Sequence, residues 1–273
     1  MVLAGSVLFG VYVLVAALFA PVVGLPVVLA GSVLFAGVQY LVGKKLALRS
    51  VDAEDLPGTE YPEIHRRVEA LCEGMDLPKP RLVVGRMGAP NAFAVGRRGA
   101  GVVAVSESML RMVEEGYMAM DELEGILAHE LAHIDNRDVV VMVMGQAVAS
   151  IVGLTVFFVV EAVLDEVPFV GFLVSYALSV VSQLLVTLFV LAISRYREYV
   201  ADRDAVVHTG NPAALASGLA KVVEVGRQEG APDPDETVAA LCFFGGTRGR
   251  LARLFATHPP AAKRIGRLEE MAD

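Results

Sequence analysis

Long stretches without any charged residue constrain this chain more than any other feature of its sequence. Residues 2–43, 139–160 and 167–193 are uncharged, and the chain is 55% hydrophobic, which is too apolar for an ordinary soluble domain. A helix that spans a membrane needs roughly 20 apolar residues at about 1.5 Å each. The last two stretches are each one helix long, and the first is two helices long, with a Pro- and Gly-marked break at 21–26. The sequence therefore predicts four transmembrane helices in two hairpins.

Two other interpretations of these stretches are weaker. A cleaved signal peptide would explain the first helix, but the segment lacks a basic N-terminal region and a second apolar span follows at once. The later stretches would suit core helices of a large soluble protein, but neither contains a single charge. We therefore expect the first helix to remain as a membrane anchor.

The charged residues that flank the apolar stretches predict the orientation in the membrane. Basic residues follow the second span, precede the third and follow the fourth, whereas the turn between spans three and four carries only acidic ones. Because short loops rich in Lys and Arg stay in the cytoplasm, this side is predicted to be cytoplasmic. The prediction is a multi-pass protein of the cell membrane, in contact with the lipid bilayer, with both termini in the cytoplasm. The hairpins are 1–43 and 139–194, and the cytoplasmic domain has two parts, 44–138 and 195–273. The basic residues are Lys44, Lys45, Arg49, Arg137, Arg195 and Arg197, and the acidic ones are Glu161, Asp165 and Glu166.

Net charge and cysteine content exclude two other classes of protein. The formal net charge of −8 argues against a nucleic-acid-binding protein, which normally carries a basic face. Cys72 and Cys242 are far apart in the sequence and fit neither a disulfide framework nor a zinc site built on cysteine pairs. We expect two reduced, buried thiols, which suit a reducing compartment.

The first soluble part is predicted to combine helices with a small β-sheet. Residues 60–76 carry apolar side chains at helical spacing. Short β-branched runs punctuated by Gly and Pro predict three strands, with a turn at 97–99 before the last of them. Ser106 can cap the helix that follows. The strands are predicted at 81–87, 91–96 and 101–105.

Helix-start signals recur in the rest of the soluble sequence. Asp121 and Glu124 form a D-x-x-E capping box, which predicts that a helix starts near Glu122. The remaining predictions are a helix over 195–208, a helix that Asn211-Pro212 caps and begins, a loop at 231–236, a stop at 257–260 and a last amphipathic helix from Pro260.

The segment ILAHELAHIDN at 126–136 places two imidazoles and a carboxylate on the helix that starts near Glu122. His129 and His133 are four residues apart and share a face, so both can bind one ion through ring nitrogens. Glu130 is turned about 100° away and can reach a water molecule at the site. A chance pair of surface histidines does not account for this spacing on a capped helix. The H-E-x-x-H pattern therefore predicts two zinc ligands and a general base, Glu130.

A catalytic zinc needs a third protein ligand and an open position. The metzincin pattern would require glycine at 136 and histidine at 139, but the chain has Asn136 and Val139. The third ligand must therefore lie elsewhere. Glu198 is favoured, because Asp202 lies one turn later on the same face and can accept the free N–H of a ligand histidine. The candidates are Glu198, Asp202, Asp204, His208 and His258.

Both segments that carry proposed ligands adjoin apolar stretches. His133 lies six residues before the third span, and Glu198 lies five residues after the fourth. These separations are roughly 9 Å and 7.5 Å along a helix. We therefore expect an active site at the membrane surface. An intramembrane protease would carry H-E-x-x-H inside an apolar span, whereas here acidic residues precede the motif closely.

Four segments of the chain form a specific combination: HELAH at 129–133, SRYREYVAD at 194–202, PNAFAVG at 90–96 and THPP at 257–260. Together they resemble the HtpX-type membrane zinc metalloproteases, which are relatives of the prenyl-protein (CAAX) endoprotease. With the four-span layout, the resemblance covers nearly the whole chain. It implies a predominantly α-helical integral membrane protein whose cytoplasmic α+β protease domain is zincin-like (a gluzincin) and contains a small β-sheet.

The resemblance also implies roles for individual residues. Asn91, Ala92, Phe93 and Ala94 would lie along the substrate, and an exposed strand edge there could pair with an extended peptide through backbone hydrogen bonds. His258 would hold the substrate or the developing oxyanion; the alternative for His258 is a packing role at the start of a helix.

The predicted mechanism uses one Zn²⁺ per chain. His129, His133 and Glu198 hold the ion, which polarises water and the scissile carbonyl. Glu130 moves a proton from the water to the leaving amine. Asp202 orients a ligand histidine.

The resemblance implies a zinc endopeptidase that hydrolyses misfolded or damaged membrane proteins at the cytoplasmic membrane surface. One alternative is a processing protease for lipidated C-termini, which would need a large chamber that four spans hardly provide. Another is a non-catalytic membrane scaffold that binds zinc only structurally. Structural sites are usually closed by four ligands, whereas three are evident here.

Overall fold

The computed structural model describes residues 24–228 and 260–272, and these fall into two compact units. The first unit contains residues 24–41 and 141–193. The second contains residues 42–140, 194–228 and 260–272. The first of the four predicted spans, the predicted loop at 231–236 and nearly all of the THPP segment lie outside the described residues.

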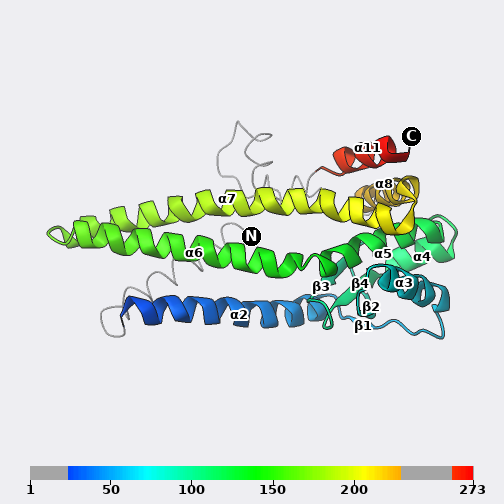
Figure 1. Cartoon of the computed structure of the whole chain (residues 1–273), viewed down its shortest axis with the longest axis horizontal. Coiled ribbons are helices and arrows are strands. Elements are labelled where there is room, and N and C mark those ends of the chain that lie inside the picture. Colours follow the sequence, from blue (N-terminus) through cyan, green and yellow to red (C-terminus); the bar gives the residue numbers. More distant parts are fainter. Residues whose placement is uncertain (1–23, 229–259, 273) are drawn as a thin grey trace. The chain divides into compact units, whose positions relative to one another are not determined.

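The first unit contains residues 141–193 of a hairpin of two long helices, α6 (Asp138–Val163) and α7 (Pro168–Thr209). Figure 1 shows them side by side and antiparallel. Phe157 is 1% exposed and meets the edge of Phe172 across the hairpin, with ring centroids 5.7 Å apart. A side chain at Gly145 would come within 2.9 Å of Val190, so glycine permits this close approach.

Both helices of the hairpin are long and apolar enough to cross a membrane, and they coincide with the third and fourth predicted spans. The second predicted span corresponds to α2 (Leu25–Ser50), which is a continuous helix. It begins directly after Gly24, whose positive φ of 81° marks the predicted break. That α2 crosses a membrane stays a prediction.

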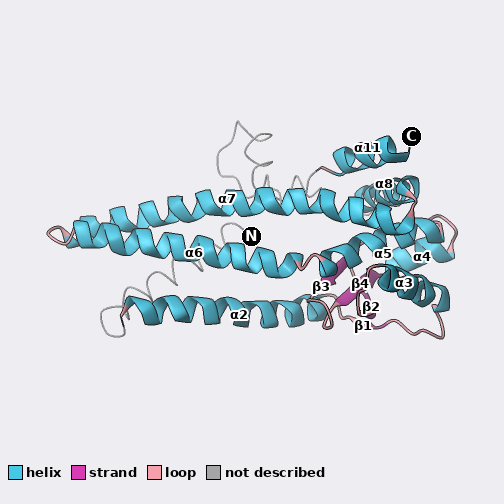
Figure 2. Ribbon diagram, in the orientation of Figure 1, coloured by secondary structure: helices cyan, strands magenta, loops and turns pink. Residues whose placement is uncertain are grey.

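A four-stranded mixed sheet lies in the second unit (Figure 2). The strand order is β1-β2-β4-β3, so β3 forms one edge; β2 and β4 are parallel, and the outer pairs are antiparallel. The three predicted strands are confirmed. A fourth strand, β1, was not predicted, because its two residues are both acidic and carry no apolar alternation. The strands are β1 (Glu54–Asp55), β2 (Arg81–Gly85), β3 (Ala92–Val95) and β4 (Val102–Ser106).

Helices cover the sheet and enclose the main hydrophobic core of the second unit. The central helix is α5 (Met120–Asp135), which packs against α3, α8 and β3. Leu123, Leu127 and Leu131 of α5 are at most 1% exposed, so the helix is anchored on its apolar face. This burial fixes the position of the polar side chains that α5 carries between these leucines. The other helices are α3 (Pro62–Gly74), α4 (Glu107–Glu114), α8 (Pro212–Gln228) and α11 (Ala261–Ala272).

Two of the predicted helix caps are confirmed. The Ser106 side chain accepts a hydrogen bond from the Met109 amide at 3.1 Å, at the start of α4. The Asn211 side chain accepts one from the Ala214 amide at 3.0 Å, at the start of α8. Each cap satisfies an amide that the first helical turn leaves unpaired.

The predicted capping box at Asp121 and Glu124 is wrong. Helix α5 starts earlier, at Met120, because the Glu122 carboxylate accepts a hydrogen bond from the Ala119 amide at 2.7 Å. Asp121 and Glu124 instead form ion pairs with Arg67 of α3. The two carboxylates that the local pattern assigned to the cap therefore pair with a cation that is distant in the sequence, Arg67.

Candidate metal centre

Helix α5 presents both histidines of the H-E-x-x-H motif on one face. The Nε2 atoms of His129 and His133 are 3.0 Å apart, and the two rings meet edge to face with centroids separated by 4.6 Å. His129 is buried, and His133 is partly buried. Their spacing of one helical turn, on a helix held rigidly in the core, brings the two nitrogens to one point.

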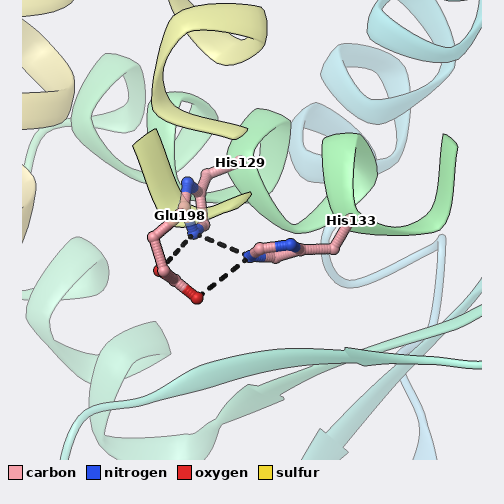
Figure 3. Close-up of side chains that lie close together, drawn as sticks. All are labelled: His129, His133 and Glu198. Carbon is pink, nitrogen blue, oxygen red and sulfur yellow. Dashed lines mark hydrogen bonds and ion pairs between the residues drawn. The ribbon is translucent and has the colours of Figure 1, made fainter. Parts of the chain in front are cut away.

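A carboxylate from α7 completes the group. Glu198 is 4% exposed, and its Oε2 lies 3.4 Å from His129 Nε2 while its Oε1 lies 3.6 Å from His133 Nε2. Figure 3 shows the three side chains pointing toward one another. Within residues 24–228 and 260–272, they form the one group of three His, Cys, Asp or Glu residues with ligand atoms close enough for a metal, all within 4.8 Å.

The donor set fits a zinc ion. Ligands at about 2.0–2.2 Å from a tetrahedral zinc lie about 3.3–3.6 Å from one another. The two separations from Glu198, 3.4 and 3.6 Å, match that spacing, and the 3.0 Å between the two imidazole nitrogens is slightly shorter. Two imidazoles with one carboxylate are also a donor set of catalytic zinc sites, whereas Ca²⁺ and Mg²⁺ prefer oxygen ligands alone.

The other candidates for a third ligand lie elsewhere. Asp204 accepts a hydrogen bond from the Asn136 side chain at 2.8 Å. His208 lies beside Gly74, at the end of α3. His258 lies outside the described residues. Asp202 is close to the centre, but it contacts the far nitrogen of His129 and not the nitrogen that faces Glu198.

Asp202 stands where an orienting carboxylate would be needed. Its Oδ1 is 3.0 Å from His129 Nδ1, and the residue is 4% exposed. A carboxylate only accepts hydrogen bonds, so it favours the tautomer of His129 that carries its proton on Nδ1 and leaves Nε2 free for a metal.

A buried arginine, Arg264 of α11, joins the centre and was not predicted. Its guanidinium donates to Asp202 at 2.8 and 2.5 Å and to Glu198 at 2.9 Å, and it lies 3.2 Å from His129 Nδ1. The sequence held a weak signal for this position. Arg264 lies four residues before Leu268, which is 1% exposed, so both occupy the buried face of the last amphipathic helix.

The surroundings shift the pKa values of the two imidazoles in opposite directions. Burial and the Arg264 charge lower the pKa of His129, but hydrogen bonds with Asp202 and Glu198 outweigh them and raise it to about 9. Burial, followed by the nearby His129, lowers the pKa of His133 to about 4. The two carboxylates thus favour a positive charge on His129, whereas burial and the neighbouring imidazole disfavour one on His133.

Glu130, the predicted general base, follows His129 on α5 and is partly buried. Its carboxylate makes no hydrogen bond with another described residue. Among the described residues, Glu130 therefore has no hydrogen-bond partner that would compete with a water molecule at the site.

The residues that were predicted to border the substrate lie on the edge strand of the sheet. Ala92 and Ala94 pack on the main core, whereas Phe93 packs with Leu48 and Met87 on the opposite face. Asn91 is exposed, and its backbone exchanges two 2.9 Å hydrogen bonds with Ser106. Strand β3 also packs against α5, the helix that carries both histidines.

Substitution of Arg264 by alanine is expected to destabilise the metal-free protein by about 3 kcal/mol, because it leaves two buried carboxylates without their cation. Melting temperatures in detergent would measure the loss, and added zinc should reduce it by supplying a replacement charge. Lys263→Ala, one residue away on an exposed position, is the control and should shift the melting temperature little. Equal melting temperatures for the Arg264 variant and the wild type would contradict this role.

The described residues form a mostly helical protein with a small mixed sheet, two membrane-length apolar helices and a His-His-Glu cluster, which together define the class of membrane metallopeptidases. The chain belongs to peptidase family M48, whose family model matches residues 59–272. It is 46% identical over 266 residues to a protease HtpX homolog of Halobacterium salinarum, and this alignment covers 89% of each chain.

Two further relatives are more distant and carry the same name. A protease HtpX homolog of Salinibacter ruber is 37% identical over 241 residues, or 86% of this chain and 84% of the relative. A protease HtpX homolog of Pyrococcus furiosus is 36% identical over 241 residues, or 86% and 82%. The resemblance to the HtpX-type proteases is thus confirmed.

Proposed function

We propose that this chain is a zinc-dependent endopeptidase that cleaves membrane-protein substrates at the cytoplasmic surface of the cell membrane. The observation that carries the proposal is the convergence of His129, His133 and Glu198, with Glu130 next to His129 on the same helix. This is the arrangement of a catalytic zinc site with two imidazoles, one carboxylate and a general base.

The residues of the chain take distinct parts in the proposed reaction. His129, His133 and Glu198 would hold the ion, which when bound supplies Lewis-acid polarisation of water and of the scissile carbonyl. Glu130 accepts the proton of the attacking water and delivers it to the leaving amine. Asp202 keeps the proton of His129 on Nδ1, 3.0 Å away.

The outer edge of β3 offers a place for the substrate backbone. No described strand pairs with this edge, and the strand packs against α5. An extended peptide added there would be held by backbone hydrogen bonds with little dependence on its sequence, which suits a protease that acts on many damaged proteins.

The position of Glu198 along α7 supports the proposal that substrates are cleaved at the membrane surface. The residue lies five positions after Ile193, the last residue of the uncharged stretch, within one continuous helix. That separation is about 7.5 Å along the helix axis. The basic residues that flank the apolar stretches support a cytoplasmic orientation for this side.

Removal of the metal from the purified full-length protein tests the proposal. A chelator should reduce casein cleavage to background, and Zn²⁺ at one equivalent per chain should restore it. Mg²⁺ and Ca²⁺ should not, because neither favours imidazole ligands. Full cleavage by protein shown by metal analysis to contain no zinc would overturn the proposal. Zinc binding without any cleavage would favour the non-catalytic scaffold.

A further inference from the structure

We propose that Asp138, the first residue of α6, is a positioning residue for the metal ligand His133. The inference rests on the proposed metal site and adds to it a residue outside the ligand set and the H-E-x-x-H motif. Asp138 is 8% exposed, and its Oδ2 lies 2.7 Å from His133 Nδ1.

The orientation of the His133 ring explains why this contact matters. Its Nε2 faces the centre, 3.0 Å from His129 Nε2 and 3.6 Å from Glu198 Oε1, whereas its Nδ1 faces Asp138. A neutral imidazole carries one proton, and a carboxylate can only accept it. Asp138 therefore holds the proton on Nδ1 and leaves the Nε2 lone pair directed at the metal.

Asp138 is itself held in place by Arg197 of α7. The Arg197 guanidinium forms an ion pair with Asp138 Oδ1 and donates a 2.6 Å hydrogen bond to the carbonyl of Asn136, which ends α5. Between these residues the backbone turns sharply at Arg137, whose φ is +57°. Arg197 thus fixes the junction of α5 and α6, and with it the distance from Asp138 to His133.

The two imidazoles of the centre are consequently oriented in the same way, each by an aspartate carboxylate that contacts its Nδ1 from a different helix. His129 Nδ1 contacts Asp202 of α7, and His133 Nδ1 contacts Asp138 of α6. Arg197, the cation that steadies Asp138, directly precedes the third ligand, Glu198, on α7. A carboxylate present only to pair with Arg197 would have no need to face a ligand nitrogen.

Asp138→Asn in the full-length protein tests the assignment. The asparagine amide can donate to His133 Nδ1 and so favour the tautomer whose proton blocks Nε2. We expect the affinity for zinc, measured by competition with a chromophoric chelator, to fall about 10- to 100-fold. Asp135→Asn is the matched control, because Asp135 pairs with Arg98 at 2.7 Å and contacts no proposed ligand. Its affinity should equal that of the wild type.

A double variant separates positioning from stability. Asp138→Asn alone leaves Arg197 without its carboxylate, whereas Asp138→Asn with Arg197→Gln removes both charges. The double variant should melt nearer the wild-type temperature than the single variant and still bind zinc about 10- to 100-fold more weakly. Zinc affinity within twofold of wild type in either variant would overturn the inference.

The same measurements distinguish this inference from the proposed function. If the wild type binds no zinc, the proposed metal site itself fails. If the wild type binds zinc and cleaves casein while either Asp138 variant keeps an affinity within twofold of wild type, the inference alone fails.

Discussion

Replacement of Glu130 by glutamine is expected to reduce the rate of peptide cleavage by about 10²- to 10⁴-fold while the protein retains its zinc. Glutamine keeps the size of the side chain but cannot accept a proton from water. His129, His133 and Glu198 are unchanged, so metal content should stay at one ion per chain. Cleavage of casein and metal analysis on the same sample would measure both quantities.

Glu124→Gln provides the matched control for this substitution. This substitution makes the same chemical change on the same helix, but the Glu124 carboxylate pairs with Arg67 and contacts no proposed ligand. We expect full activity, because a partly exposed ion pair contributes about 1 kcal/mol or less. Wild-type activity in Glu130→Gln would reject Glu130 as the base, and loss of zinc in that variant would point to a structural effect.

Local sequence pattern predicted much of the fold because it determines local structure directly. The uncharged stretches at 139–160 and 167–193 fall almost wholly within α6 and α7, and short β-branched runs punctuated by Gly and Pro located β2, β3 and β4. The failures have a common cause. Asp121 pairs with Arg67 and does not cap the helix, and β1 forms by pairing with β2. Both features depend on contacts between segments that are distant in the sequence.

The candidate site shows the same division between local and distant information. The spacing of His129 and His133 is a property of one helix, so the sequence alone was sufficient to propose them. Arg264 and Asp138 were missed, because their contacts with the centre depend on where α11 and the junction of α5 and α6 pack. A buried arginine in an amphipathic helix resembles a solvated one until its partners, Glu198 and Asp202, are known.

Replacement of Glu198 by glutamine is expected to weaken zinc binding more than any change outside the ligand set. Loss of an orienting partner costs about 10- to 100-fold in metal affinity. Glu198 is itself a proposed ligand, so its substitution should lower zinc affinity by more than about 100-fold, and cleavage should fall with zinc occupancy. Competition with a chromophoric chelator would measure the affinity. Asp204→Asn is the control on the same helix, because Asp204 bonds to Asn136 and lies outside the His-His-Glu group.

The fold of the Glu198 variant should survive, which makes the loss of zinc interpretable. Arg264 keeps two hydrogen bonds to Asp202, at 2.8 and 2.5 Å, so the buried cation is not left without a carboxylate. We therefore expect the metal-free Glu198→Gln protein to melt close to the metal-free wild type. Zinc should then raise the melting temperature of the wild type but not that of the variant, because a ligand stabilises the folded state only of a protein that binds it. If zinc stabilises both proteins equally, the third ligand is not Glu198, and His258 becomes the next residue to substitute.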